Sequence, residues 1–173
     1  MSDPIDILLQ RARQLQEELS SGAIVADTIP RYESDILELQ RLQLLEGKAS
    51  DGEDLRPYYS EDLKPQGYFR NADSAERYAR WKATEIQYPV DTNRNPDAPN
   101  LYINGQFHSE LGVEFGADQM TVQGTTMKAQ AIILKYGLDQ FGLAADKLNE
   151  IVWGRGLYKD ILENVERLMY GTR

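Results

Sequence analysis

Few residues of this chain could perform chemistry, and its single histidine is the first to consider. His108 lies in the run Gln106-Phe107-His108-Ser109-Glu110. A catalytic serine needs a base and an orienting carboxylate that converge on it in space, which adjacency in sequence does not establish. A zinc site needs several His or Cys ligands, whereas this chain has one histidine and no cysteine. We therefore expect His108 to be an ordinary polar or packed side chain, and we assign no catalytic residue.

An acidic turn and a glycine-flanked arginine are the other candidates for a small-ligand site. Asp51-Gly52-Glu53-Asp54 clusters three carboxylates, but a calcium loop of the EF-hand type spreads its ligands over twelve positions. Gly154-Arg155-Gly156 is shorter than any glycine-rich phosphate-binding motif. We expect a solvated turn at the first segment, and neither a metal nor a cofactor.

The aromatic residues in the first half of the chain do not indicate a nucleic-acid site. Tyr58, Tyr59, Tyr68 and Phe69 are not interleaved with a basic run, as a base-stacking platform requires. We expect these rings to be core residues or interface anchors.

Composition and charge favour one folded domain that makes contacts. Its 173 residues suit a single domain, and 41% hydrophobic with 27% charged residues is ordinary for a globular chain. The formal net charge of −9 argues against binding to phosphate backbones, which depends on basic clusters. The N-terminal residues have neither the basic nor the apolar part of a signal peptide, and no apolar run is long enough to span a membrane. The sequence therefore predicts neither secretion nor membrane insertion.

Helices are expected at the N-terminal end. A first helix begins at Pro4 and stops at Ser20-Ser21-Gly22, and a second runs from near Pro30 to Gly47. The residues between them, 23–29, form either a short strand or a helical continuation. Both helices carry an apolar stripe on a charged surface, which packs against the domain or docks on a neighbouring subunit.

The middle of the chain is less regular. After an extended segment at 55–59, Asp73 or Ser74 is expected to cap a short helix that continues through Trp81. Residues 84–100 are rich in proline and asparagine, which is typical of a loop. Loops of this length are usually functional or flexible, so this one is a candidate for a segment ordered by a partner.

A β-hairpin and further helices complete the expected fold. Alternating apolar residues predict antiparallel strands at 111–115 and 120–122, and 101–103 is either a third strand or a helical turn. Helices are expected at 129–136 and at 144–170, the latter interrupted by its Gly-Arg-Gly run. The fold class is therefore α+β, with N-terminal helices, a small central antiparallel sheet with a β-hairpin, and C-terminal helices. We expect residues 1–47 to be a helical segment packed on or extending from an α+β core of residues 48–173.

Several short motifs follow one another in a distinctive order. They are Leu44-Leu45-Glu46-Gly47, Leu55-Arg56-Pro57-Tyr58-Tyr59-Ser60, residues 99–107, Lys135-Tyr136-Gly137 and Phe141-Gly142-Leu143. This order resembles the tail-completion, neck and virion-morphogenesis proteins of tailed bacteriophages, over roughly residues 40–170. The stretches at 57–60 and 95–100 are similar to proteins from phages and prophages of Bacteroidetes-type hosts.

The resemblance implies a structural role without an active site. It implies a homo-oligomeric ring, a hexamer or a dodecamer, that joins the portal-connector complex to tail-tube or tail-terminator proteins. DNA would pass nearby without specific binding, and the protein would reside in the virion neck and, during assembly, in the host cytoplasm. The alternatives are a host-directed acidic binding module, such as an inhibitor or DNA mimic, and a small phage-encoded hydrolase.

Contacts with partners are expected from the first helix, the aromatic segment, the long loop and the hairpin. The candidate interface residues are Ile5, Leu8, Leu9, Leu15, Tyr58, Tyr59, Arg94, Asn95, Asp97 and Phe115.

Overall fold

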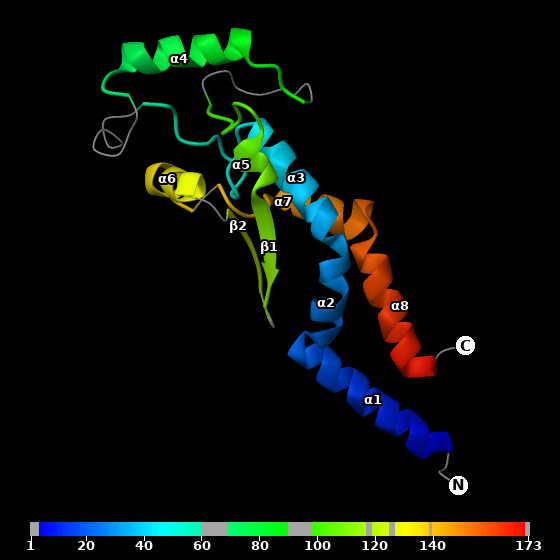
Figure 1. The fold of residues 1–173 in the computed structure, drawn as a ribbon. Coiled ribbons are helices and arrows are strands. Elements are labelled where there is room, and N and C mark those ends of the chain that lie inside the picture. The colour runs from blue at the N-terminus through cyan, green and yellow to red at the C-terminus, as the bar shows by residue number, and fades with distance from the viewer. Residues whose placement is uncertain are drawn as a thin grey trace.

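The computed structural model has an α+β fold, with helices at both ends of the chain and a two-stranded antiparallel hairpin between them (Figure 1). The residues that it describes are 4–59, 69–89, 98–116, 119–124, 127–138 and 140–171, without the side chains of 127, 128, 135 and 136. The elements form an elongated arrangement in which the first helix and the helix of residues 72–85 lie at opposite ends (Figure 1). The expected fold class is therefore confirmed.

Helices account for most of the described elements. In chain order the elements are α1 (Pro4–Ser21), α2 (Ala23–Thr28), the 3-10 turn η1 (Ile29–Tyr32), α3 (Glu33–Leu45), α4 (Ala72–Glu85), α5 (Gln106–Ser109), β1 (Leu111–Phe115), β2 (Met120–Gly124), α6 (Met127–Tyr136), α7 (Ala145–Asn149), the π-helical turn η2 (Glu150–Gly154) and α8 (Leu157–Tyr170). The expected N-terminal and C-terminal helices are present, and the 23–29 segment continues as helix rather than strand.

Two local expectations differ from the structure. The cap of α4 is Asn71, whose side-chain oxygen accepts a hydrogen bond of 2.9 Å from the backbone N–H of Ser74, so the helix begins before Asp73. Residues 101–103 are not a strand, because the described residues form one sheet of β1 and β2 alone. Leu101 instead has a φ of 52°, in the left-handed region where a strand cannot continue.

The hairpin places one face of its strands on the core. Leu111 lies opposite Gly124, and Val113 lies opposite Val122. Leu111 and Val122 are buried, as the two-residue periodicity of a strand requires for a sheet with one covered face.

Helix α3 is the centre of the fold, because it contributes to both hydrophobic clusters. Ile36 and Leu39 pack in one cluster with residues of β2 and α8, and Leu44 packs in the other with residues of α5, β1 and α6. Within the expected helical segment 1–47, α3 is therefore part of the core, whereas α1 extends away from it (Figure 1).

Two buried glutamines of α3 hold the loop that precedes α7. The Gln40 amide donates to the carbonyl of Gln140 at 2.9 Å, and its oxygen accepts from the N–H of Gly142 at 2.9 Å. Gln43 donates to the Gly142 carbonyl at 2.9 Å and accepts from the N–H of Ala144 at 2.7 Å. Backbone groups buried away from water need hydrogen-bond partners. Here the two glutamine side chains supply the partners that a neighbouring strand supplies in a sheet.

The C-terminal helices are held on α3 and α2 by polar contacts. The Arg155 guanidinium lies 2.9 Å from Asp35 and 3.2 Å from Glu38 of α3. Asn164 of α8 donates to the hydroxyl of Thr28 at 2.7 Å, in a buried contact. Together these contacts fix the direction in which α8 leaves the core.

Replacing Gln43 by a side chain of similar size without hydrogen-bonding groups is expected to destabilise the fold. Gln43→Met leaves the Ala144 N–H and the Gly142 carbonyl unpaired, at a cost of about 1–3 kcal/mol for each buried group. The free energy of unfolding, measured by urea denaturation, should therefore fall by about 2–6 kcal/mol. The matched control is Gln130→Met on the exposed side of α6, which should change it by less than about 0.5 kcal/mol. Equal effects for the two variants would contradict the role of Gln43.

Candidate interaction surfaces

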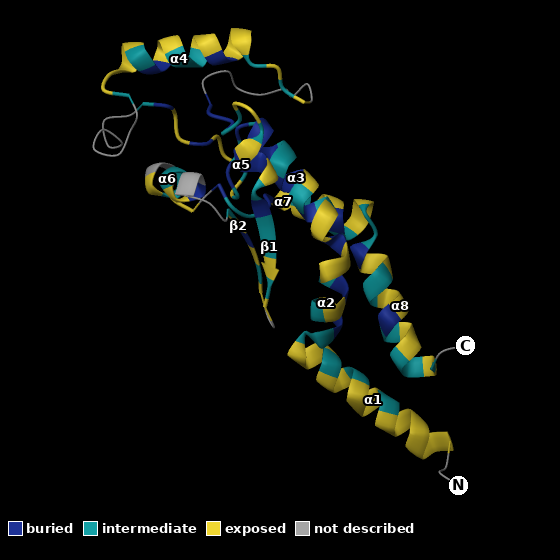
Figure 2. Ribbon diagram, viewed as in Figure 1, coloured by how far each residue is buried: buried dark blue, intermediate teal, exposed yellow. Residues whose placement is uncertain are grey.

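Helix α1 is an arm that the other described residues leave largely uncovered. None of its eighteen residues, all of them described, is buried, and the helix is exposed along almost its entire length (Figure 2). All of its large apolar residues except Ile7 nevertheless follow helical spacing and form a single stripe. We call this stripe the arm face, and its members are Ile5, Leu8, Leu9, Ala12, Leu15 and Leu19. An apolar stripe of this length without a covering element is typical of an interaction surface.

The arm is attached at two points. Gly22, between α1 and α2, has a φ of 74°, and a Cβ placed there would meet no atom within 4 Å. Glycine is therefore favoured at this joint by its backbone conformation alone. Further along α1, the Arg11 guanidinium donates to the carbonyl of Met169 near the end of α8 at 3.2 Å. Arg11 therefore lies beside the C-terminal end of α8, and α1 itself extends away from the core (Figure 1).

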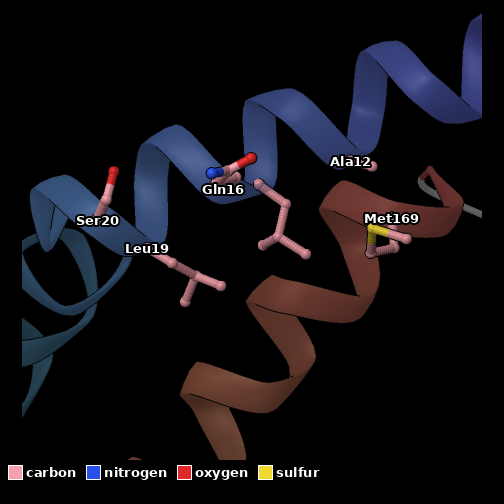
Figure 3. Close-up of a pocket in the computed structure, with 6 residues that line it drawn as sticks. Ala12, Gln16, Leu19, Ser20 and Met169 are labelled. Carbon is pink, nitrogen blue, oxygen red and sulfur yellow. The ribbon is translucent and has the colours of Figure 1, made fainter.

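An open apolar groove of about 540 Å³ lies between the arm and α8 (Figure 3). Its lining residues are Ala12, Leu15, Gln16, Leu19, Ser20 and Met169. Leu19 and Met169 project toward the space between the two helices, and Leu19 remains 54% exposed. The groove is thus the part of the arm face nearest the body of the protein.

A second apolar surface lies at the other end of α8. Trp153 is 64% exposed, and its ring centroid is 4.6 Å from that of Tyr158. We call these two residues the aromatic face. Exposed tryptophan and tyrosine held on rigid elements are the residue types most often found at the energetic centre of protein interfaces.

The aromatic face is held rigidly by its surroundings. The π-helical turn η2 contains Trp153, and Arg155 directly after it pairs with Asp35 and Glu150. Gly156 then takes a φ of 95° and starts α8. Single π-helical turns inside helical segments occur frequently at functional sites. The sequence analysis did not identify this face, although a tryptophan beside a glycine-bounded break was the available signal.

The expected interface residues lie in different environments. Ile5, Leu8 and Leu9 are exposed on the arm face, and Leu15 is half-buried there. Phe115 is half-buried and packs against the first hydrophobic cluster. Tyr59 is half-buried and Tyr58 is buried, whereas Arg94, Asn95 and Asp97 lie outside the described residues.

Tyr58 is an anchor for α4 rather than part of an exposed surface. Its ring makes edge-on contacts with Tyr78 at 5.2 Å and with Phe69 at 6.1 Å. Its hydroxyl accepts a hydrogen bond of 3.2 Å from the buried ammonium of Lys82. Tyr58 therefore occupies a core position, which the sequence allowed beside the role of an interface anchor.

His108 is buried and packed. Because a carbonyl oxygen can only accept, its Nε2 donates to the Asn100 carbonyl, at 3.1 Å. Its ring lies edge-on to Tyr102 at 5.2 Å. The hydroxyl of neighbouring Ser109 donates to the Gln106 carbonyl rather than to the histidine. The expectation of a packed histidine is confirmed.

The remaining sites considered from the sequence also have a structural explanation. Asp51 accepts from the Glu53 N–H at 3.0 Å, and Asp54 pairs with Lys48 at 2.8 Å, as in a solvated turn. Across the described ranges, no group of three or more His, Asp or Glu side chains is placed to hold a metal ion. In the same part of the chain, no helix is both long and apolar enough to cross a membrane.

The buried histidine predicts a loss of stability in acid. Burial lowers the pKa of His108 to about 4, and the charges of Lys82 and Arg41 lower it too, against the hydrogen bond to Asn100, which raises it. The folded state therefore binds its proton less readily than the unfolded chain, whose histidine titrates near 6.5. The contribution of His108 to the free energy of unfolding is fully present above pH 6.5. It is lost as the pH drops toward 4, by up to about 3 kcal/mol.

The measurement is the free energy of unfolding between pH 7 and pH 4, in the protein and in a His108→Gln variant. Carboxylates also titrate in the lower half of this range, so the comparison between the two curves isolates the histidine. The variant should show a smaller loss between pH 6.5 and 5. Parallel curves would show that His108 titrates normally.

Comparison with protein-family models, with curated proteins and with solved structures finds no match to this chain. Its functional interpretation therefore depends on the arm face, the aromatic face and the order of its sequence motifs.

Proposed function

We propose that this protein is a structural subunit of the neck of a tailed phage, of the tail-completion or head–tail joining type. It would form a ring that joins the portal-connector complex to the tail. The observation that carries the proposal is that the described residues expose two separate apolar surfaces. The arm face and the aromatic face lie near opposite ends of α8.

Two separate surfaces are what a ring subunit needs. Each member of a closed ring contacts one neighbour with one surface and the other neighbour with a different surface. An adaptor must in addition contact the assemblies above and below the ring. Trp153 and Tyr158 supply the aromatic anchors that dominate the energy of such contacts, and the arm face supplies a helix that can lie in a neighbour's groove.

The motif order that resembles phage neck proteins supports the same proposal. Two of its glycines occupy positions that demand glycine: Gly137, which ends α6, has a φ of 80°, and Gly142 has a φ of 106°. Gly142 lies in the loop held by Gln40 and Gln43. The motifs therefore mark turns on which the packing of the C-terminal helices depends.

The acidity of the chain is compatible with a DNA passage. A net charge of −9 repels the phosphate backbone, so a genome could slide through such a ring without adhering to its wall. This part of the proposal requires that the acidic side chains line the passage of the assembled ring. A basic lumen in the assembled ring would refute it.

The proposal predicts binding to the portal-connector complex encoded with this protein. Mass photometry of the mixture should show a joint particle, and Trp153→Asp should weaken its formation at least thirtyfold, because loss of an interface anchor costs about 2 kcal/mol or more.

Ile103→Asp is the matched control for this measurement. Ile103 is also a large apolar residue, 52% exposed, but it lies outside both faces. Its replacement should leave binding unchanged. Absence of a joint particle with either portal or tail proteins would contradict the proposed function.

The proposal also predicts that the purified protein does not retain DNA. In an electrophoretic mobility assay at about 50 mM salt, where phosphate contacts are strongest, duplex DNA of random sequence should migrate freely. Retardation that disappears with added salt would show a basic contact surface and would contradict the proposed passage.

A further inference from the structure

We infer that the free protein pairs with a second copy of itself through α1, with the two helices antiparallel and each lying in the other's groove. This inference does not depend on the proposed function. It concerns the arm of the free protein, before the protein joins any larger assembly.

The arm face has the spacing of a helix–helix seam. Residues 5, 8, 12, 15 and 19 are separated alternately by three and four positions, which is the a and d pattern of a coiled coil. All five are apolar. The described residues leave much of this seam open to a second molecule, because Ile5, Leu8 and Leu19 are each more than half exposed and the groove toward α8 is unfilled.

Antiparallel alignment makes the seam complementary to itself. It places Leu8 of one copy opposite Leu19 of the second, and Ala12 opposite Leu15 of the second. Each pair then occurs twice across the two-fold axis, as in any isologous contact. The small Ala12 faces the larger Leu15, so that the central layers can fill without overpacking.

The charges beside the seam also favour this alignment. Arg11 and Glu18 are seven residues apart and lie along the same edge of the seam. Antiparallel pairing brings Arg11 of one copy beside Glu18 of the second, and Glu18 beside Arg11 of the second. Parallel pairing would instead place Arg11 beside the neutral Gln16. Complementary charges at these flanking positions set the orientation of paired helices.

The area is sufficient for a stable dimer only when both grooves take part. Ile5, Leu8, Leu9 and Leu19 are each more than half exposed, and a side chain of this size and exposure presents on the order of 100 Å². From two copies these side chains supply roughly 800 Å², against about 1,200 Å² for the smallest stable interfaces. The groove residues around Met169 must provide the remainder. Because the arm lies directly beside α8, they are adjacent to the seam.

Disulfide trapping tests the pairing directly, since the chain contains no cysteine. Leu8 and Leu19 are eleven positions apart, or about 16 Å along one helix, so they cannot join within a copy. The full-length double variant Leu8→Cys with Leu19→Cys should therefore form a covalent dimer under mild oxidation. The single variant Leu8→Cys should not, because Leu8 of the second copy lies equally far away.

Two outcomes of these measurements would overturn the inference. Trapping of the single variant as readily as the double one would indicate parallel or random contact. A protein that sediments as a monomer at about 50 μM, with no trapping of the double variant, would show that another molecule covers the arm face. Loss of portal binding with the dimer intact would affect only the proposed function.

A charge exchange distinguishes pairing between copies from effects on folding. Arg11→Glu and Glu18→Arg should each weaken dimerisation about tenfold, because each converts two attractive pairs into repulsive ones. The combined variant should restore it, although the Arg11 contact with the Met169 carbonyl in the same copy stays lost. A combined variant that dimerises no better than either single one would refute the antiparallel alignment.

Discussion

The hydrogen bonds of Gln40 and Gln43 to the loop before α7 are the constraint on which the rest of the structure depends. They attach that loop to α3, which among the described helices is the one that contributes buried residues to both hydrophobic clusters. The position of α7, of the π-helical turn and of α8 follows from this attachment, and the contacts of Arg155 with α3 complete it. A protein with so small a sheet has few ladder hydrogen bonds, so side-chain amides perform the connecting role that strands perform elsewhere.

The arm contrasts with this rigid centre. Because no residue of α1 is buried, its apolar side chains contribute little to the stability of a single copy. The core therefore places little demand on these positions, and we attribute their regular spacing to the contact with a second molecule that we infer.

Much of the fold is predictable because it depends on periodicity. The stripes of α1, α3 and α8 and the alternation in β1 and β2 are local patterns. The burial of Gln40 and Gln43 was not predicted, although both share a helical face with Ile36. Their partners lie about a hundred positions away, and only the tertiary structure brings these together. Tyr58 and Trp153 illustrate the same limit, since the sequence did not distinguish the buried ring from the exposed one.

The exposure of Trp153 has an optical consequence. The chain has two tryptophans, of which Trp153 is 64% exposed and Trp81 is 44% exposed. The emission of Trp153 is therefore the closer of the two to that of a solvated indole, and unfolding shifts it less. Covering the aromatic face would move the Trp153 emission to shorter wavelength. Trp153 is thus an intrinsic reporter of docking.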